Sequence, residues 1–304
     1  MAADTIAGLV CSRLEEKGYR GKVVPIEHLA ELKSEIEDSF SQGKIDPHLY
    51  GKRLIYFQFD VAARFPRARS IIVTAAAQPQ RKATFRYNGR THSVIIPPTY
   101  YGDTDKRIKS LLQNILVFND YWLHEVTLPE KLLATRSGLA KYGKNNITYV
   151  EGMGSFVALR VFVSDMPPGR SEWSEPQVMK ACNRCKACLN ECPTGAIVAD
   201  RFLVHAERCL TFFNEGSEEF PGWISRSWHN SLVGCMKCQL VCPVNKPFFN
   251  WVEDGEDFDE TETRLILDKV GAERLPRETV HKLNRCYMME YLELLSRNLR
   301  VLLR

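Results

Sequence analysis

Little in this sequence suggests a membrane, an export route or a nucleic-acid surface. No apolar run approaches the roughly 18 residues of a membrane-spanning helix, so we expect no membrane partner. The first residues, Met1 to Thr5, carry neither the basic segment nor the apolar core of an export signal, which predicts a cytoplasmic protein. The net charge of +4 permits contact with nucleic acid without arguing for it. With 304 residues, 44% hydrophobic and 26% charged, the composition is that of a globular protein of about two domains.

Cysteine, in contrast, is abundant and clustered. Eight of the ten cysteines fall in two groups, one of the eight standing alone between them. Residues 182–193 have the pattern C-x₂-C-x₂-C-x₃-C-P, and residues 235–243 have C-x₂-C-x₃-C-P. Three thiolates on one tight loop can hold three corners of a [4Fe–4S] cube, and the cysteine before the proline points toward a neighbouring cube. The sequence therefore predicts two [4Fe–4S] clusters that relay single electrons.

The same pattern predicts which cysteines share a cluster. One set is Cys182, Cys185, Cys188 and Cys242, and the other is Cys192, Cys209, Cys235 and Cys238. A disulfide framework would need an oxidising compartment, and a zinc site would use paired C-x₂-C knuckles, so both alternatives are weak. The remaining cysteines, Cys11 and Cys286, lie in helical patterns and are interpreted as buried, inert thiols.

The chain before residue 170 has the pattern of an α/β domain. Apolar spacing predicts helices over residues 6–14, 28–40 and 103–124. The run 70–77 predicts a buried strand, and Asn88-Gly89 predicts a hairpin between strands 84–87 and 91–96. Two further strands are expected over 147–150 and 156–163. After the second cysteine group, the seven acidic residues within 253–262 predict a solvated loop or the start of a helix, and 277–304 a terminal helix.

The loop from Gly138 to Asn145 is one residue short of a P-loop. It has Asn145 where a magnesium-binding Ser or Thr belongs, it follows a predicted helix, and a predicted strand comes after it. A P-loop has the opposite order, so we expect no nucleoside triphosphate site. Glycines and an exposed lysine would still let such a backbone approach a flat, polar-edged ligand.

Several segments together resemble the epoxyqueuosine reductase family. They are Gly138-Leu139, Gly143-Lys144-Asn145, Gly154-Ser155-Phe156, the first cysteine run with Thr194-Gly195-Ala196-Ile197 after it, Arg208-Cys209-Leu210, the second cysteine run, and Arg297-Asn298. Members of this family join a nitroreductase-like, cobalamin-binding domain to a ferredoxin-like domain with two clusters. They reduce the epoxide of epoxyqueuosine in tRNA to give queuosine.

The resemblance implies an α+β protein in three parts. These are a nitroreductase-like α/β domain over 1–169, a ferredoxin-like double [4Fe–4S] domain over 170–250 and a helical segment over 251–304. It also implies that Gly138, Gly143, Lys144 and Asn145 bind cobalamin. The partners implied are tRNA and a low-potential electron donor of the flavodoxin or ferredoxin type.

A catalytic acid is implied by the same resemblance. An oxygen leaving carbon needs a proton, and the family places an aspartate in a segment of the type G-R-D-Y-H-K. This sequence has Tyr101-Gly102-Asp103-Thr104-Asp105-Lys106, so Asp103 matches the aspartate while Thr104-Asp105 replaces Tyr-His. The alternative for Asp103 is a helix N-cap.

Two further alternatives remain open from the sequence. The predicted hairpin mixes Arg81, Lys82, Arg86 and Arg90 with Phe85 and Tyr87, which would suit RNA phosphates and a base. The favoured alternative is a solvated two-stranded ribbon whose aromatic side chains pack inward. For the whole protein, the alternative to a reductase is an electron carrier or reductive activator without bound corrin.

Overall fold

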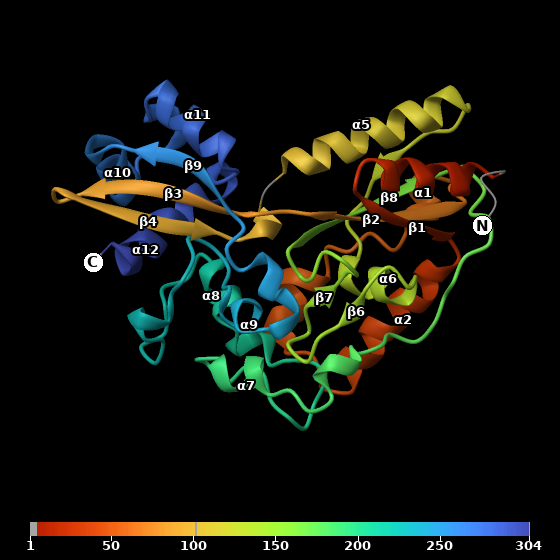
Figure 1. The fold of residues 1–304 in the computed structure, drawn as a ribbon, viewed down its shortest axis with the longest axis horizontal. Coiled ribbons are helices and arrows are strands. Elements are labelled where there is room, and N and C mark those ends of the chain that lie inside the picture. The colour runs from red at the N-terminus through yellow and green to blue at the C-terminus, as the bar shows by residue number, and fades with distance from the viewer. Residues whose placement is uncertain (1–4, 101, 304) are drawn as a thin grey trace. The chain divides into compact units, whose positions relative to one another are not determined.

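The computed structural model describes residues 5–100 and 102–303. The N-terminal residues before Thr5, in which we saw no export signal, lie outside this range, as do Tyr101 and Arg304. The chain forms two compact units, each built from two separate segments (Figure 1). Unit 1 is Met1–Ala77 with Gly102–Cys185, and unit 2 is Gln78–Tyr101 with Lys186–Arg304. The division into these two units differs from the three expected domains, whose boundaries follow residues 169 and 250. Those domain boundaries stay predictions.

Unit 1 is built around an antiparallel sheet of four strands in the order β1-β2-β8-β5. The strands are β1 Arg20–Pro25, β2 Ser70–Ala77, β8 Val157–Ser164 and β5 His124–Glu125. A separate pair consists of β6 Lys141–Tyr142 and β7 Thr148–Tyr149. The helices are α1 Ile6–Glu16, α2 His28–Ser41, α3 Pro47–Leu49, α4 Val61–Arg64, α5 Asp103–Phe118 and α6 Glu130–Arg136, with a π-helical turn Tyr50–Leu54 and a 3-10 turn Lys180–Cys182.

Helices cover both faces of this sheet (Figure 1). Alternate residues of β2 point to opposite faces. Ile71 and Val73 belong to the core that includes residues of α2 and α6, whereas Ile72 belongs to the core that includes residues of α1 and α5. Because both faces are buried, β2 is apolar except for Ser70 and Thr74, which is why its sequence predicted a buried strand even though the sheet is antiparallel.

The predictions for unit 1 are confirmed for α1, α2, β2 and β8, but two of the predicted elements are wrong in extent. Helix α5 ends at Phe118 rather than at residue 124. Asp120 takes a left-handed conformation with φ 61°, and the Tyr121 N–H donates to the Leu116 carbonyl at 2.8 Å. This is a Schellman ending without the usual glycine. The strand expected over 147–150 is only β7, and it pairs with β6.

Unit 2 contains a three-stranded sheet in the order β4-β3-β9. Its strands are β3 Gln80–Tyr87, β4 Arg90–Ile96 and β9 Val252–Phe258. Its helices are α7 Ala187–Glu191, α8 Leu210–Asn214, α9 Lys237–Leu240, α10 Glu260–Leu267, α11 Arg277–Arg285 and α12 Leu292–Leu302, with 3-10 turns Pro98–Tyr100, Ala206–Arg208, Arg226–Trp228, Pro243–Phe248, Ala272–Arg274 and Met289–Tyr291. The hairpin is confirmed: Asn88 and Gly89 have φ of 51° and 69°, the left-handed pair that a type I′ turn requires.

The acidic segment 253–262 was predicted as a solvated loop or helix start. The helix start is confirmed, since α10 begins at Glu260 with Asp259 as its N-cap, but the prediction is wrong for residues 253–258, which belong to strand β9. This strand pairs in parallel with β3 (Figure 1). Its acidic side chains meet basic ones on β3 in the ion pairs Arg81–Glu253 (3.1 Å), Lys82–Asp254 (2.6 Å) and Arg86–Asp257 (2.7 Å). At its end, Phe258 stacks on the buried Phe85 with ring centroids 4.7 Å apart. Charge pairing and aromatic packing therefore stabilise a strand in a segment whose composition suggested solvent.

The single helix predicted over 277–304 is also wrong. Tyr287 is left-handed with φ 58°, and the Met288 N–H donates to the Leu283 carbonyl at 2.8 Å, so α11 ends and the separate helix α12 follows. Leu283, Leu295 and Leu299 are fully buried in the core of unit 2. The break thus lets both helices turn an apolar face to the same core.

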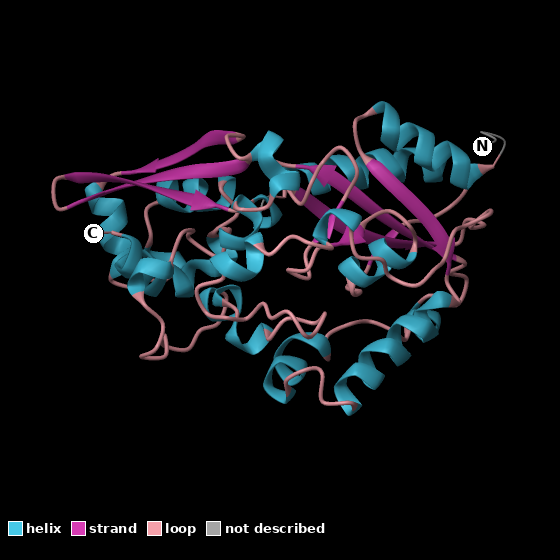
Figure 2. Cartoon of the chain, turned by 60° about the horizontal axis from the view of Figure 1, so that its bottom comes forward, coloured by secondary structure: helices cyan, strands magenta, loops and turns pink. Residues whose placement is uncertain are grey.

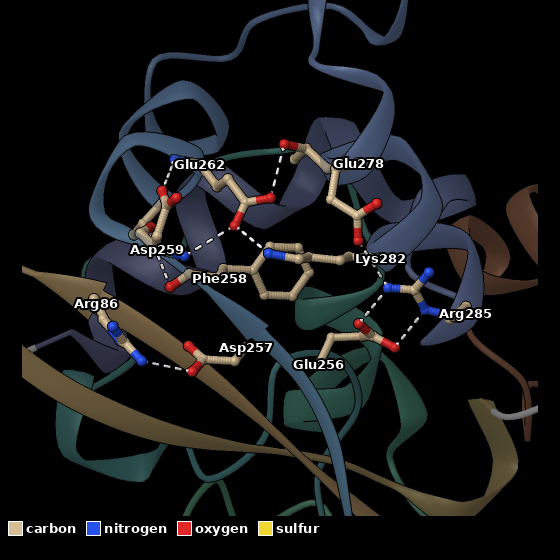
Figure 3. A network of polar contacts seen from close by, with 11 residues as sticks. Arg86, Glu256, Asp257, Phe258, Asp259, Glu262, Glu278, Lys282 and Arg285 are labelled. Carbon is tan, nitrogen blue, oxygen red and sulfur yellow. Dashed lines mark hydrogen bonds and ion pairs between the residues drawn. The ribbon is translucent and has the colours of Figure 1, made fainter.

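A buried ion pair joins α10 to α11 (Figure 3). Glu262 accepts from Lys282 Nζ at 2.5 Å, from the Thr279 hydroxyl at 3.0 Å and from the Asp259 N–H at 2.9 Å. Arg285 of α11 reaches back to Glu256 of β9 through two hydrogen bonds of 2.8 and 2.9 Å. These contacts fix α10 and α11 to the sheet edge.

Figure 2 shows the helices, strands and loops of the chain. In unit 2, the segment 186–251 consists of short helices and 3-10 turns joined by irregular loops. It carries six of the eight clustered cysteines. Across residues 5–100 and 102–303, no helix has both the length and the apolar character needed to cross a bilayer.

Candidate functional site

Two short helices position part of the cysteine array. Cys188 lies in the short helix α7 and Cys238 in the short helix α9, and these two helices pack against each other. A Lys237–Glu191 ion pair of 3.4 Å links them. All ten cysteines lie in the described part of the chain, and each is a thiol rather than half of a disulfide. The disulfide alternative is therefore excluded for this structure.

The set Cys192, Cys209, Cys235 and Cys238 lies entirely within unit 2. The pKa of the Cys235 thiol is raised to about 11, mainly by burial and also by the nearby Cys209 and Cys192, while hydrogen bonds from Asn230 and the Lys237 N–H oppose the rise. Three of the four predicted ligands therefore lie close enough to influence one another's charge. Their assignment to one cluster stays a prediction.

Asn230 forms hydrogen bonds to Cys235 and its neighbours, and no sequence motif predicted this contact. Its Nδ2 donates to Cys235 Sγ at 3.3 Å and to the Trp228 carbonyl at 3.0 Å, and its Oδ1 accepts from the Met236 N–H at 2.8 Å. A buried sulfur with N–H donors suits an electron-rich iron–sulfur ligand, because such bonds stabilise negative charge on the cluster. The described residues thus fit a cluster at this position.

We expect Asn230→Asp to lower the reduction potential of one cluster. The variant keeps the acceptor for Met236, removes the donor to Cys235 and adds negative charge. Losing one hydrogen bond of about 0.5–1.5 kcal/mol from the reduced state corresponds to roughly 20–60 mV for a one-electron couple. A redox titration followed by EPR would measure it. Asn284→Asp is the matched control, since Asn284 donates to the Val280 carbonyl on α11. Two unchanged potentials would show that Cys235 ligates neither cluster.

Helix α12 holds the chain that leads into the Cys235 loop. Asn298 Nδ2 donates to the carbonyls of Asn214 and Leu232, each at 2.9 Å, and Asn214 Nδ2 donates to the Gly234 carbonyl at 2.6 Å. Arg297 donates to the Phe213 carbonyl at 2.8 Å. The Arg297-Asn298 pair that contributed to the sequence resemblance is therefore a buried clamp on the cysteine segment.

Tyr100 packs directly against this loop. Its hydroxyl donates to the Glu215 carboxylate, and its pKa is held well above the ordinary value by burial and by Glu215. Gly234, with φ 65°, has no room for a side chain, because an added Cβ would lie 2.5 Å from the Tyr100 oxygen. No motif in the sequence indicated that Tyr100 and Glu215 would pack against the Cys235 loop.

The other predicted set divides between the units, with Cys182 and Cys185 in unit 1 and Cys188 and Cys242 in unit 2. In unit 1, Lys144 Nζ donates to the carbonyls of Asn183 and Cys185, both at 3.3 Å. Lys144 thus supports the loop that carries the first two cysteines. The four-cysteine set itself stays a prediction.

Single-ion metal sites are a separate matter. In the described part of the chain, no three His, Cys, Asp or Glu side chains are arranged to hold one metal ion. This does not conflict with cubane clusters, since each cysteine of a cube binds a different iron and the thiolates lie further apart than the ligands of one ion.

Residues of the loop expected to bind cobalamin form hydrogen bonds and packing contacts with other parts of the protein. Asn145 is buried, donates to the Tyr149 hydroxyl at 3.0 Å and accepts from the Ile147 N–H at 3.3 Å. A Cβ at Gly143 would lie 2.5 Å from the Asn145 side-chain oxygen, so this glycine is required for packing. Gly138 is left-handed, with φ 72°, at the turn after α6. These contacts explain the loop without a ligand, and its binding of cobalamin stays a prediction.

Asp103 is the first residue of α5 and is half-buried. The N-cap position is taken by Gly102, so the interpretation of Asp103 as the helix N-cap is wrong. Its carboxyl group lies in the first turn, where a negative charge is favoured by the helix dipole. The catalytic role of Asp103 stays a prediction.

The hairpin favours the structural alternative over an RNA surface. Arg81, Lys82 and Arg86 are neutralised by β9, and the Phe85 side chain is 1% exposed. Its aromatic residues pack inward as the ribbon interpretation expects.

Comparison with known proteins agrees with this geometry. Residues 181–245, which include all eight clustered cysteines, match the 4Fe-4S double cluster binding domain. The epoxyqueuosine reductase of Atelocyanobacterium thalassa is 29% identical over 199 residues, 63% of each chain, and that of Bacillus subtilis is 29% identical over 206 residues, 64% of this chain and 50% of the relative. In sequence, this chain is therefore similar to the epoxyqueuosine reductases.

Solved epoxyqueuosine reductases share the fold. The structure from Streptococcus thermophilus has a TM-score of 0.67 at 17% identity, and one from Bacillus subtilis has 0.70 at 22% identity; each match covers 97% of this chain and 80% of the other. A third, crystallised with an epoxyqueuosine-modified tRNA stem loop, has a TM-score of 0.58 at 22% identity and covers 79% of this chain and 65% of the other. The α+β class and the family resemblance are confirmed. The chain spans less than two thirds of the length of these two curated epoxyqueuosine reductases.

Proposed function

We propose that this chain is an oxidoreductase that reduces epoxyqueuosine in tRNA to queuosine. The observation that carries the proposal is the cysteine array, held by α7, α9 and the Arg297-Asn298 clamp, in a chain similar in sequence to epoxyqueuosine reductases. A solved epoxyqueuosine reductase that was crystallised with the modified tRNA stem loop supports tRNA as the substrate.

Two [4Fe–4S] clusters would be held by the two cysteine sets. Cys192, Cys209, Cys235 and Cys238 would ligate one, with Asn230 donating to the Cys235 sulfur. Cys182, Cys185, Cys188 and Cys242 would ligate the other, with Lys144 supporting its loop. When bound, the clusters and a corrin cobalt would supply single low-potential electrons to the substrate. Ligands that must remain thiolates are suited to the reducing cytoplasm.

The proton would come from Asp103. Removing an epoxide oxygen as water consumes protons as well as electrons, and a positioned carboxylic acid can deliver one as the carbon–oxygen bond breaks. The first turn of α5 places Asp103 at a half-exposed position, where a carboxyl group can exchange protons with solvent between turnovers.

The electron donor would be a small low-potential protein of the flavodoxin or ferredoxin type. Two cubes ligated by one segment have no other evident use than to receive electrons one at a time from such a carrier.

One observation favours a second candidate, an electron carrier or reductive activator without corrin. The polar side chains of Lys144 and Asn145, which the resemblance assigns to cobalamin, are bonded within the protein. With these bonds in place, the loop would support the cysteines and bind no cofactor of its own.

Anaerobic purification with added cobalamin separates the two candidates. The reductase should retain one corrin per chain beside about eight irons from two cubes and convert a modified tRNA stem loop to the queuosine form. Iron analysis, the corrin absorption spectrum and nucleoside analysis would measure these. About eight irons without retained corrin or turnover would select the carrier instead.

A further inference from the structure

One arginine in unit 1 lies close to two carboxylates from two different helices. Arg160, on the inner strand β8, donates through Nη2 to the Asp105 carboxylate in the first turn of α5. Its Nη1 lies 3.9 Å from Glu130 Oε1 in the first turn of α6. The same Nη1 donates to the Leu159 carbonyl at 2.5 Å, so the guanidinium is held against its own strand.

This group is largely withdrawn from water. The side chains of Arg160 and Asp105 are only 24% and 19% exposed. Asp105 Oδ1 is buried without a hydrogen-bond partner among the described residues. Burial raises the pKa of Asp105 even though Arg160 opposes the rise, and it raises the pKa of Glu130 to about 7. An ion pair in such surroundings adds little net stability, while the loss of one partner is costly, so its main effect is on position rather than on stability.

Helix geometry relates this pair to Asp103. Residues two apart on an α-helix are about 200° apart around the axis. When Asp105 faces β8, Asp103 must therefore point away from the sheet. The ion pair also lies within the first turn, where unpaired backbone groups leave a helix free to fray.

We propose that the Arg160–Asp105 ion pair positions Asp103, by holding the first turn of α5 against β8 so that the Asp103 carboxyl group is presented on the opposite side. Asp105 is thus a positioning residue and not itself the proton donor. It stands where the G-R-D-Y-H-K pattern has histidine, so the device belongs to this chain's departure from that pattern. The inference rests on the proposed role of Asp103.

Asp105→Asn and Arg160→Gln test the pair in the holoprotein. Each should lower kcat for an epoxyqueuosine-modified tRNA stem loop by roughly ten- to a hundredfold, because small displacements of a reacting group have effects of that size. KM and iron content should stay near the wild-type values. The double variant should be no slower than the slower single variant, since both changes remove one interaction. Asp105→Glu should restore much of kcat.

Hydrogen exchange gives a readout that needs no turnover. In the Asp105→Asn protein, amides of the first turns of α5 should exchange faster, while those near Leu116 stay protected. Lys109→Gln is the matched control on the same helix, since it removes only the exposed 3.2 Å pair with Glu125 and should change neither quantity.

The outcomes separate this inference from the proposed function. Wild-type kcat and wild-type exchange in both single variants would overturn the positioning role alone. A protein that keeps full turnover after Asp103→Asn would overturn the proton-donor role and the inference with it.

Discussion

Replacing Asp103 by Asn is expected to lower turnover of an epoxyqueuosine-modified tRNA stem loop by about 10²- to 10⁴-fold, the usual contribution of a general acid. Asn keeps the size of the side chain and its place in the first turn of α5 but has no acidic proton to give. Single-turnover assays under anaerobic conditions would measure the rate, with iron and corrin determined on the same samples. Both cofactors should be retained in full.

Asp120→Asn is the matched control for this experiment. Asp120 is exposed at the other end of α5 with φ 61°, a conformation that Asn also adopts readily, so turnover should not change. Unaltered turnover in Asp103→Asn would remove Asp103 from the chemistry. Loss of iron or corrin together with turnover would instead indicate that Asp103 supports the structure.

Replacing Lys282 by Met is expected to destabilise unit 2 by about 3 kcal/mol. This removes one partner of a buried ion pair, which costs about 3–5 kcal/mol because the remaining charge is left in a poorly solvated place. The Glu262 side chain is 8% exposed. It keeps the Thr279 hydroxyl and the Asp259 N–H as donors, which is why we expect the lower end of that range (Figure 3).

Urea unfolding followed by circular dichroism would measure the change, with the slope of the transition compared between variants. Arg274→Met is the control in the same unit, since the Arg274–Glu273 pair is 72% and 74% exposed and should contribute little. An equal midpoint for Lys282→Met and Arg274→Met would show that the pair between α10 and α11 is not a stabilising contact.

Part of this fold could be predicted from the sequence, because it depends on local residue preferences. Asn88-Gly89 specifies a tight hairpin by its own backbone preference, and the apolar spacing of α1 identifies its buried face. The cysteine spacing was readable for the same reason, since a cube constrains ligands on one short loop. These features depend on residues near one another in the chain.

The errors arose where the usual local signal was missing. Helices α5 and α11 end in the same left-handed turn that glycine normally provides, but here Asp120 and Tyr287 occupy it. Strand β9 could not be predicted from its acidic composition, because the basic partners on β3 are 172 residues away in the Arg81–Glu253 pair. The roles of Asn230 and Arg160 could not be predicted, because the role of a single polar residue depends on which groups lie beside it in the folded protein.

The parallel pairing of β3 with β9 has a consequence for how the protein is made. Strand β3 leaves the ribosome roughly ten to thirty seconds before its partner at ordinary rates of synthesis. All eight clustered cysteines are translated in that interval, so their loops exist before β3 can pair with β9. Iron delivered during synthesis would therefore reach the cysteines before β3 and β9 have paired, and a fragment limited to residues 170–250 would lack both strands of this pair.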